Sequence, residues 1–314
     1  MTLHIESQLA GSILQPNNNW DISVQKQLSA FKNPDYLIGP RVDLLQGDIS
    51  REWFKWIVDQ FVDKRFFNEK TNFFEIYTDV RDSIELLIGN QKDEDDKQKI
   101  SELISISVEQ RINFLKQDDR NRKNITTTIK EDLLTIYGQE PRCWLTGLKF
   151  SQEAVFNFTA KKVDKQPIQL PTFVDRYRPI GTNERDLCIE VDHLFPFSYG
   201  GPDDLNNYRL ICGWANRVKS NHITGYSTGT KVSGASKLFP TSFYYWVIRT
   251  LGLKRKCEVA GCNNNITNSE LTVCSQLGSS KAITPVSMKV ICKDHDNREN
   301  RYIRRDSVKE RFLL

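Results

Sequence analysis

Apolar residues in the first part of the chain recur at intervals of three and four positions, which is the period of an amphipathic helix. This spacing covers residues 50–67, 72–87 and 100–115 and predicts three helices. The segment 91–99 is charged, so we expect it to be an exposed connection between the second and third helices. Residues 1–139 are therefore predicted to form a helical N-terminal domain.

Two features refine this helical region. The expected helix 50–67 carries a stripe of aromatic side chains, namely Trp53, Phe54, Trp56, Phe61 and Phe66. At helical spacing such a stripe is expected to pack in a core, with a base-stacking platform as the alternative. A further helix is predicted to begin at a capping box formed by Thr128 and Glu131 and to stop at Gly138.

After residue 140 the helical period gives way to short apolar runs of strand length. The clearest unit reads as strand, loop, strand and helix, at residues 188–192, 196–205, 208–212 and 214–219. The loop is assigned from its Pro, Ser, Gly and Asp residues. A strand-like run is also expected at 154–158.

The C-terminal part continues the mixed pattern. Residues 239–253 fit either an amphipathic helix or a pair of strands, and 271–275 and 286–291 are strand-like. The expected fold class is therefore α+β. We expect a central domain at 140–236 and a small C-terminal module at 237–314.

The composition is typical of a soluble globular protein, with 39% hydrophobic and 27% charged residues in a chain of 314. No apolar run approaches the roughly 18–20 residues that span a membrane. The first 20 residues lack the basic start and apolar core of a secretory signal. A cytoplasmic protein without membrane contact is therefore expected.

Charge is distributed unevenly along the chain. Up to Glu140 there are 18 Lys and Arg against 24 Asp and Glu, and from Pro141 onward there are 26 against 16. The resulting net charge of +10 in the second part suits a surface that binds phosphate groups. Double-stranded DNA is the expected partner, and formation of a homodimer stays open.

Four polar residues of the central unit could converge, namely Asp192, His193, Asn207 and Asn216. Carboxylate and amide oxygens are ligands that Mg²⁺ or Mn²⁺ accepts. An imidazole changes its charge near neutral pH and can take a proton from water. Together these groups indicate metal-assisted hydrolysis, in which the cation neutralises charge on a scissile phosphate.

These residues resemble the motif of the HNH endonuclease family, the ββα-metal nucleases. The family pattern Asp-His-x-x-Pro-x-Ser-x-Gly-Gly corresponds to residues 192–201 of this chain. The pattern Asn-Leu-x-x-x-Cys corresponds to 207–212, and Cys-Asn-x-x-Lys to 215–219. The resemblance covers about a tenth of the chain, with its pieces in the same order and spacing.

The resemblance implies a role for each matched residue. His193 would be the general base, and Asp192 and Asn216 would bind the active-site metal. Asn207 would brace the loop and hold His193 in orientation. Asn216 stands where the family often has His, a variant that is also found in the family. Four basic residues are expected to contact nucleic acid, namely Lys161, Lys162, Arg217 and Lys219.

The chain has seven cysteines, and an odd count without a signal peptide argues against a framework of disulfides. Two close pairs near the C-terminus have the spacing of a tetrahedral zinc site, namely Cys257 with Cys262 and Cys292 with His295. We expect these four residues to hold a structural Zn²⁺, with Cys274 as the alternative ligand.

A second zinc site is common in proteins of the HNH family, held by two Cys-x-x-Cys pairs around the catalytic motif. This chain keeps one cysteine of each pair, Cys143 and Cys212. Thr146 and Ala215 occupy the other two places, and zinc needs four ligands. We therefore expect buried thiols at this position.

These features together predict a Mg²⁺-dependent DNA endonuclease that hydrolyses phosphodiester bonds, as in a bacterial restriction endonuclease. The alternatives are the nuclease subunit of another anti-phage defence system, a homing endonuclease, or a non-catalytic zinc-containing nucleic-acid-binding protein. The loop 220–236 is rich in Gly, Ser and Thr and is expected to approach the nucleic acid.

Overall fold

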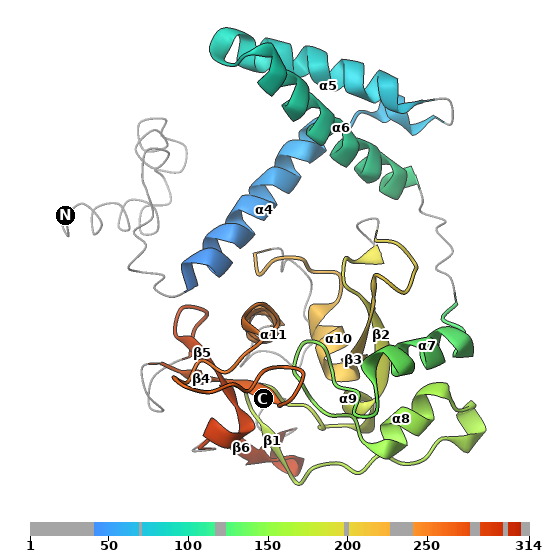
Figure 1. The fold of residues 1–314 in the computed structure, drawn as a ribbon, viewed down its shortest axis with the longest axis vertical. Helices are drawn as coiled ribbons and strands as arrows, with labels where there is room; N and C mark the ends of the chain where they lie inside the picture. The colour runs from blue at the N-terminus through green and yellow to red at the C-terminus, as the bar shows by residue number, and fades with distance from the viewer. Residues whose placement is uncertain are drawn as a thin grey trace, which may run out of the picture. The chain divides into compact units, whose positions relative to one another are not determined.

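The computed structural model describes the chain in seven stretches, namely residues 41–68, 71–116, 124–197, 201–226, 241–276, 283–297 and 301–308 (Figure 1). The chain divides into a unit Met1–Val42 and a unit Asp43–Leu314, and the description below concerns the second unit. Helices and small antiparallel hairpins alternate in it, which confirms the α+β class. No helix within the described stretches is long and apolar enough to cross a membrane.

The N-terminal part of this unit is helical, as the sequence predicted. Helix α4 spans Val42–Gln60, α5 spans Phe73–Ile88 and α6 spans Glu94–Lys116, with a short 3₁₀ turn η3 at Lys64–Phe67. Helices α5 and α6 lie side by side (Figure 1). Their facing apolar side chains form one core cluster with Val58 of α4 and Phe66 of η3. The members from α5 and α6 are Ile76, Val80, Ile84, Ile104, Val108 and Ile112.

The charged segment 91–99 is exposed at most of its positions, as the sequence predicted, but it is not a separate connection, because α6 begins inside it. Asp93 accepts a hydrogen bond of 2.8 Å from the backbone N–H of Asp96, which caps the first turn. Acidic residues in a first turn are stabilised by the helix dipole. Lys97 is only 3% exposed, and its Nζ lies 2.9 Å from carboxylate oxygens of Glu85 and Glu94.

The aromatic stripe of α4 is not the core feature that its spacing predicted. Trp53 is 63% exposed and Trp56 is 59% exposed, whereas Phe66, beyond the end of the helix, is buried. The helix starts eight residues before the predicted range, and its buried positions are Leu44, Leu45, Asp48 and Val58. The aromatic side chains therefore lie on a different face of the helix from its buried residues.

The helix α7, at Thr127–Tyr137, ends at Gly138 as predicted, but its N-terminal cap is Thr126. The Thr126 hydroxyl oxygen accepts from the N–H of Ile129 at 3.3 Å, so the capping box expected at Thr128 is not formed. The buried side chain of Leu133 packs in the core of the central elements. Helix α7 thus packs with the hairpin and helix of residues 189–219, which are described below.

The segment 154–158 was expected to be a strand and is part of helix α8, Gln152–Thr159. Ser151 caps this helix by accepting from the N–H of Ala154 at 3.2 Å. Ala154 and Phe158 are four residues apart and are both buried, which is the pattern of one helical face. Similarly, residues 239–253 contain a helix, α11 at Thr241–Lys254, and no strand is formed within its described part.

Three two-stranded antiparallel sheets carry the β-structure of the described residues. Strand β2, Ile189–His193, pairs with β3, Tyr208–Cys212, and is preceded by the short helix α9, Glu184–Leu187. Strand β4, Leu271–Ser275, pairs with β5, Met288–Cys292. Strand β1, Phe173–Asp175, pairs with β6, Tyr302–Arg304, so the C-terminal segment returns to the central part.

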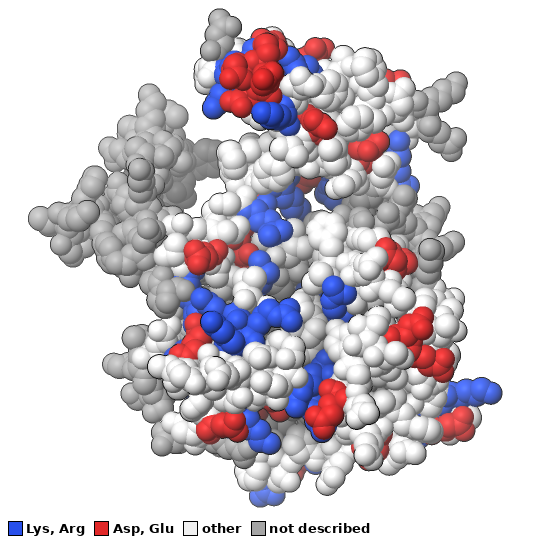
Figure 2. All heavy atoms as spheres, in the orientation of Figure 1, with Lys and Arg blue, Asp and Glu red and all other residues white. Residues whose placement is uncertain are grey.

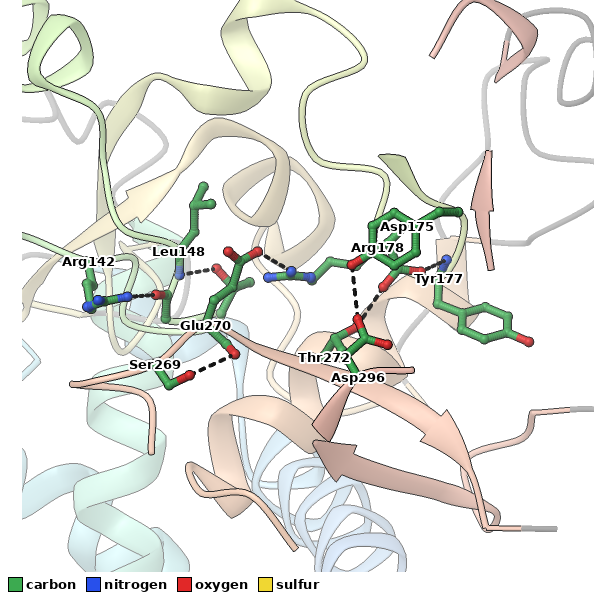
Figure 3. A network of polar contacts seen from close by, with 12 residues as sticks. Arg142, Leu148, Asp175, Tyr177, Arg178, Ser269, Glu270, Thr272 and Asp296 are labelled. Carbon is green, nitrogen blue, oxygen red and sulfur yellow. Dashed lines mark hydrogen bonds and ion pairs between the residues drawn. The ribbon is translucent and has the colours of Figure 1, made fainter. Parts of the chain in front are cut away.

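A buried ionic network joins β1 to the C-terminal elements (Figure 3). Asp175 accepts hydrogen bonds from the hydroxyl of Thr272 at 2.7 Å and the N–H of Tyr177 at 2.9 Å. Its Oδ2 also lies 3.0 Å from Nε of Arg301, while Arg178 pairs with Glu270. Burial raises the pKa of Asp175, and the charges of Arg301 and Arg178 oppose that shift.

Candidate functional site

The segment 188–219 folds as a β-hairpin followed directly by a helix. Strands β2 and β3 pair with His193 opposite Tyr208, and helix α10, Gly213–Lys219, begins at the residue after β3. The hairpin and the helix pack in the main core cluster, whose members include Ile189, Leu210, Ile211, Ala215 and Val218. The strands and helix expected from the sequence are therefore present, within a residue or two at each end.

Asn207 ties the ends of the loop between β2 and β3 together. Its Oδ1 accepts from the N–H of Phe195 at 2.8 Å, and its Nδ2 donates to the carbonyls of Phe195 and Pro202 at 2.9 and 3.0 Å. Gly201 lies inside this turn, where a Cβ would be only 2.0 Å from the carbonyl oxygen of Phe195. Residues 198–200 of the family pattern lie outside the described residues.

His193 ends β2 and is 3% exposed. Its Nε2 lies 2.6 Å from Oδ1 of Asp203, a residue of the loop that the sequence analysis did not single out. The hydroxyl of Tyr208 donates to the same oxygen at 3.1 Å, and the Tyr208 ring meets the imidazole edge-on at 5.1 Å. The imidazole is therefore held by a carboxylate and an aromatic ring.

Asp192 is 4% exposed and has protein donors at both carboxylate oxygens. Nζ of Lys219 lies 2.8 Å from Oδ1, and Nε1 of Trp144 donates to Oδ2 at 3.1 Å. Lys219 also donates to the carbonyl of His193 at 2.8 Å. Burial raises the pKa of Asp192, and the Lys219 ammonium acts against this shift.

Asn216 lies on α10 and faces a second acidic residue. Its Nδ2 donates to Oε2 of Glu190 at 2.6 Å, and Oε1 of Glu190 accepts from Nε of Arg185 at 3.2 Å. Glu190 is two residues before Asp192, so both side chains leave the same face of β2. The alternation of side chains along a strand thus already predicts from the sequence that Glu190 lies beside Asp192.

A hollow of about 750 Å³ collects most of these groups. Its lining includes Asp192, His193, Asn216, Glu190, Arg185, Arg217 and Lys219. Asn207 is not part of the lining and acts on the loop behind it. Of the basic residues expected to contact nucleic acid, Arg217 pairs with Asp186, whereas Lys161 and Lys162 lie on the surface away from this lining.

Most of the expected nucleic-acid loop, at 227–236, lies outside the described residues.

The four residues expected to bind zinc come together near the C-terminus. Cys257 and Cys262 flank a turn in which Gly261 has a φ of 76°, while Cys292 ends β5 and His295 lies in a 3₁₀ turn. Their ligand atoms all lie within 4.8 Å of one another. Sγ of Cys262 is 3.9 Å from Sγ of Cys292, and Nδ1 of His295 is 3.6 Å from Sγ of Cys257.

The surroundings of this Cys₃His cluster suit thiolate ligands. Burial opposes ionisation of Cys292, but hydrogen bonds from Asn264 and His295 outweigh it and lower the pKa of that thiol to about 6. Nδ2 of Asn264 donates to the Cys292 sulfur at 3.2 Å. Cys274 lies on β4 opposite Lys289 and is not a member of the group. The cluster is compatible with a zinc site.

Cys143 and Cys212 are fully buried in the central core cluster, together with Ala215 at one of the missing ligand positions. Thr146, at the other missing position, is also buried. In the stretches that the structure describes, the Cys₃His cluster is the one group of three or more candidate metal ligands of the His, Cys, Asp and Glu types. Apolar packing therefore holds the central unit together at this point.

No protein-family profile, curated protein or solved structure matches this chain. The function is therefore inferred from the side chains of the site and from their arrangement.

Proposed function

We propose that this protein is a metal-dependent DNA endonuclease of the HNH type, which hydrolyses phosphodiester bonds. The observation that carries the proposal is the hollow beside β2 and α10, because it gathers Asp192, His193 and Asn216 at the end of one hairpin. The resemblance in sequence gives these residues the roles of metal ligand, general base and metal ligand. The bracing of the loop by Asn207 agrees with the fourth role.

The residues of the hollow fit a hard divalent cation such as Mg²⁺. Asp192 and Asn216 offer carboxylate and amide oxygens, and a carboxylate oxygen can accept more than one partner. The ammonium of Lys219 lies between Asp192 and the carbonyl of His193, so these two oxygens already accept a positively charged partner. A bound cation would supply positive charge that neutralises the scissile phosphate and its leaving oxygen.

The protein groups would carry the rest of the reaction. His193 removes a proton from a water molecule as the water oxygen forms its bond to phosphorus. The bond between phosphorus and the leaving sugar oxygen then breaks, and that oxygen takes a proton from solvent. Arg185 and Arg217 line the hollow and place positive charge where the phosphate backbone would lie.

DNA is the proposed substrate because the net charge from Pro141 onward is +10. Restriction of foreign DNA is the proposed biological role and rests on the family resemblance alone. We also propose that the Cys₃His cluster binds one structural Zn²⁺, because its four protein ligands would complete a tetrahedral site.

His193→Ala is the decisive variant for the catalytic role. Cleavage of plasmid and phage DNA in Mg²⁺ should fall about 100- to 10,000-fold, while DNA binding stays close to that of the wild type. EDTA should abolish cleavage by the wild type. Cleavage by the variant at the wild-type rate would refute the assignment. Binding by the wild type without any cleavage would favour the non-catalytic nucleic-acid-binding protein.

Two neighbouring asparagines provide a matched test of the loop. Asn207→Ala removes three hydrogen bonds that close the loop and should reduce cleavage strongly. Asn206→Ala changes an exposed side chain beside it and should leave cleavage unchanged. Equal activities of the two variants would show that the loop brace does not support the reaction.

A further inference from the structure

His193 and Tyr208 share one acceptor, the Oδ1 atom of Asp203. Nε2 of His193 lies 2.6 Å from this oxygen, and the Tyr208 hydroxyl donates to it at 3.1 Å. The side chain of Asp203 is almost as buried as that of His193. The three residues come from the end of β2, the loop and the start of β3, so the hairpin itself brings them together.

This geometry sets which ring nitrogen carries the proton. An ionised carboxylate can only accept hydrogen bonds, so the nitrogen that lies 2.6 Å from it must be the donor. In a neutral imidazole the second nitrogen is then unprotonated and can accept a proton. A carboxylate that holds one nitrogen of a histidine fixes both the tautomer and the orientation of the ring.

We propose that Asp203 is a positioning residue that holds His193 as the Nε2–H tautomer and thereby makes Nδ1 the atom that removes the proton from water. The catalytic part rests on the proposed nuclease function, whereas the tautomer is a property of the hairpin alone. The proton from water goes to Nδ1, and the Nε2 proton stays in the hydrogen bond to Asp203. The resulting imidazolium keeps the carboxylate as its counter-charge.

The charged groups around His193 indicate what the Asp203 carboxylate does. Several charged groups line the hollow on which His193 lies, namely Arg185, Glu190, Asp192, Arg217 and Lys219. Lys219 already pairs with Asp192, and Glu190 contacts Asn216 and Arg185. Asp203 is hydrogen-bonded to the imidazole, so it is placed to stabilise the positive ring that proton transfer creates, and the nearby Asp192 carboxylate acts in the same direction.

The tautomer can be read directly by NMR in the full chain. The sequence has four histidines, so ¹⁵N-histidine labelling gives few signals, and a His193→Gln variant assigns those of His193. Long-range ¹H–¹⁵N spectra above neutral pH should show His193 protonated at Nε2 in the wild type. In Asp203→Ala the signals should move from this single tautomer toward the mixture of the two tautomers found in a free neutral imidazole. A wild-type His193 protonated at Nδ1 would overturn the proposal.

The kcat of variants at Asp203 tests whether its hydrogen bond to His193 supports catalysis. Asp203→Ala should lower kcat about 10- to 100-fold with little change in KM, because the substrate contacts remain. Asp203→Asn keeps a carbonyl that can accept from Nε2 and should retain more activity than Asp203→Ala. Asp204→Asn is the matched control, since the adjacent Asp204 only caps the turn through backbone N–H groups and Asn can do the same.

The outcomes separate this inference from the proposed function. If the wild type shows the Nε2–H tautomer but cleaves no DNA, the nuclease proposal fails and the positioning by Asp203 stands. If the wild type cleaves DNA and Asp203→Ala keeps both the tautomer and kcat, the positioning role fails. Should Asp203→Ala not fold, the wild-type spectrum and the kcat of Asp203→Asn relative to Asp204→Asn still decide.

Discussion

Asp192 and Lys219 form an ion pair that is almost entirely removed from water. Such a pair gains little net free energy over an apolar pair, but the loss of one partner leaves an uncompensated charge. Lys219 also donates to the carbonyl of His193, so the same ammonium holds the side chain of Asp192 and the backbone of His193. The pair therefore has a structural role at the end of β2.

A double-mutant cycle measures this coupling. Lys219→Met should lower the free energy of unfolding by roughly 3–5 kcal/mol, because the Asp192 carboxylate is left buried with Trp144 as its donor. Asp192→Asn combined with Lys219→Met should recover a large part of that loss, since neither charge is then left alone. Urea denaturation of the four proteins gives the coupling. Strictly additive changes would contradict a direct interaction.

The sequence motif names the candidate site residues but not their contacts. Asp192, His193, Asn207 and Asn216 follow from the motif, and the strand period places the first two at the end of β2. The role of Asp203 could not be read from the sequence, because Asp204 beside it has the same chemistry. Only the course of the loop decides that one carboxylate meets His193 and the other caps a turn.

The hairpin β4–β5 and the turn before it carry the Cys₃His cluster. The segment 257–295 is about 40 residues long, a size at which an apolar core alone is usually insufficient. Zinc bound at the cluster, as proposed above, would therefore supply much of the folding free energy of this segment. The stability of this module should depend on the metal more than on its apolar packing.

Cys262→Ser should release the zinc and loosen this hairpin, because it removes one of four ligands. Elemental analysis of the purified protein measures the metal, and amide hydrogen exchange over residues 257–295 measures the loosening. Cys274→Ser is the matched control, since Cys274 lies outside the cluster and should leave the zinc in place. Zinc loss in the control, or zinc retention in Cys262→Ser, would refute the ligand set.

Strand β1 depends on a carboxylate whose pKa is raised by burial, that of Asp175. With a native pKa above the unfolded one, the native state binds the proton more tightly, so this contribution to stability falls as pH rises above about 3.8. In Asp175→Asn the contribution is absent. The unfolding free energy of the wild type should therefore fall, relative to that of Asp175→Asn, as pH rises from about 4 to 7.

Urea denaturation across that pH range measures the difference. Asp306→Asn is the control, because Asp306 is an exposed residue and its substitution should shift the curve equally at every pH. Parallel curves for the wild type and Asp175→Asn would show that burial does not disfavour the ionised carboxyl.

The helices and hairpins were predictable where the apolar period was long or where turn residues bounded it. The limits of β3 and β4 agree with the predicted ranges, because Asn207 and Gly213 bound the first run and Glu270 and Gln276 bound the second. The five-residue run 154–158 was ambiguous, because a run of this length fits a helix or a strand. The cap at Ser151 and the packing of Phe158 decide for the helix.

Acidic residues exceed basic ones up to Glu140, and basic residues exceed acidic ones from Pro141 onward. Figure 2 shows acidic side chains gathered at the turn between α5 and α6, where Glu94, Asp95 and Asp96 begin α6. Lys and Arg gather over α11, whose last turn leads into Lys254, Arg255 and Lys256. DNA is therefore expected to meet the basic elements after residue 141.

DNA affinity should fall steeply with salt concentration, as counterions are released on binding. Replacing the exposed Arg255 and Lys256 together by Ala should weaken binding and reduce the slope of log K against log salt by about one per lost phosphate contact. Lys92→Ala, at the turn before α6, is the control and should leave the slope unchanged. Fluorescence anisotropy at several salt concentrations measures the slope. An equal loss in the control would place the binding surface on the helices.

The contacts of His193 close short loops, and this affects the order in which the protein folds. Asp203 meets His193 across only 10 residues and Asn207 meets Phe195 across 12, whereas Asp175 meets Thr272 across 97. Contacts between residues close in sequence cost less loop entropy and form sooner. During synthesis the hairpin β2–β3 can therefore assemble before the residues of the Cys₃His cluster have left the ribosome. Partial unfolding from the C-terminal end would release β6 and then the hairpin β4–β5, and would leave the His193 imidazole in place.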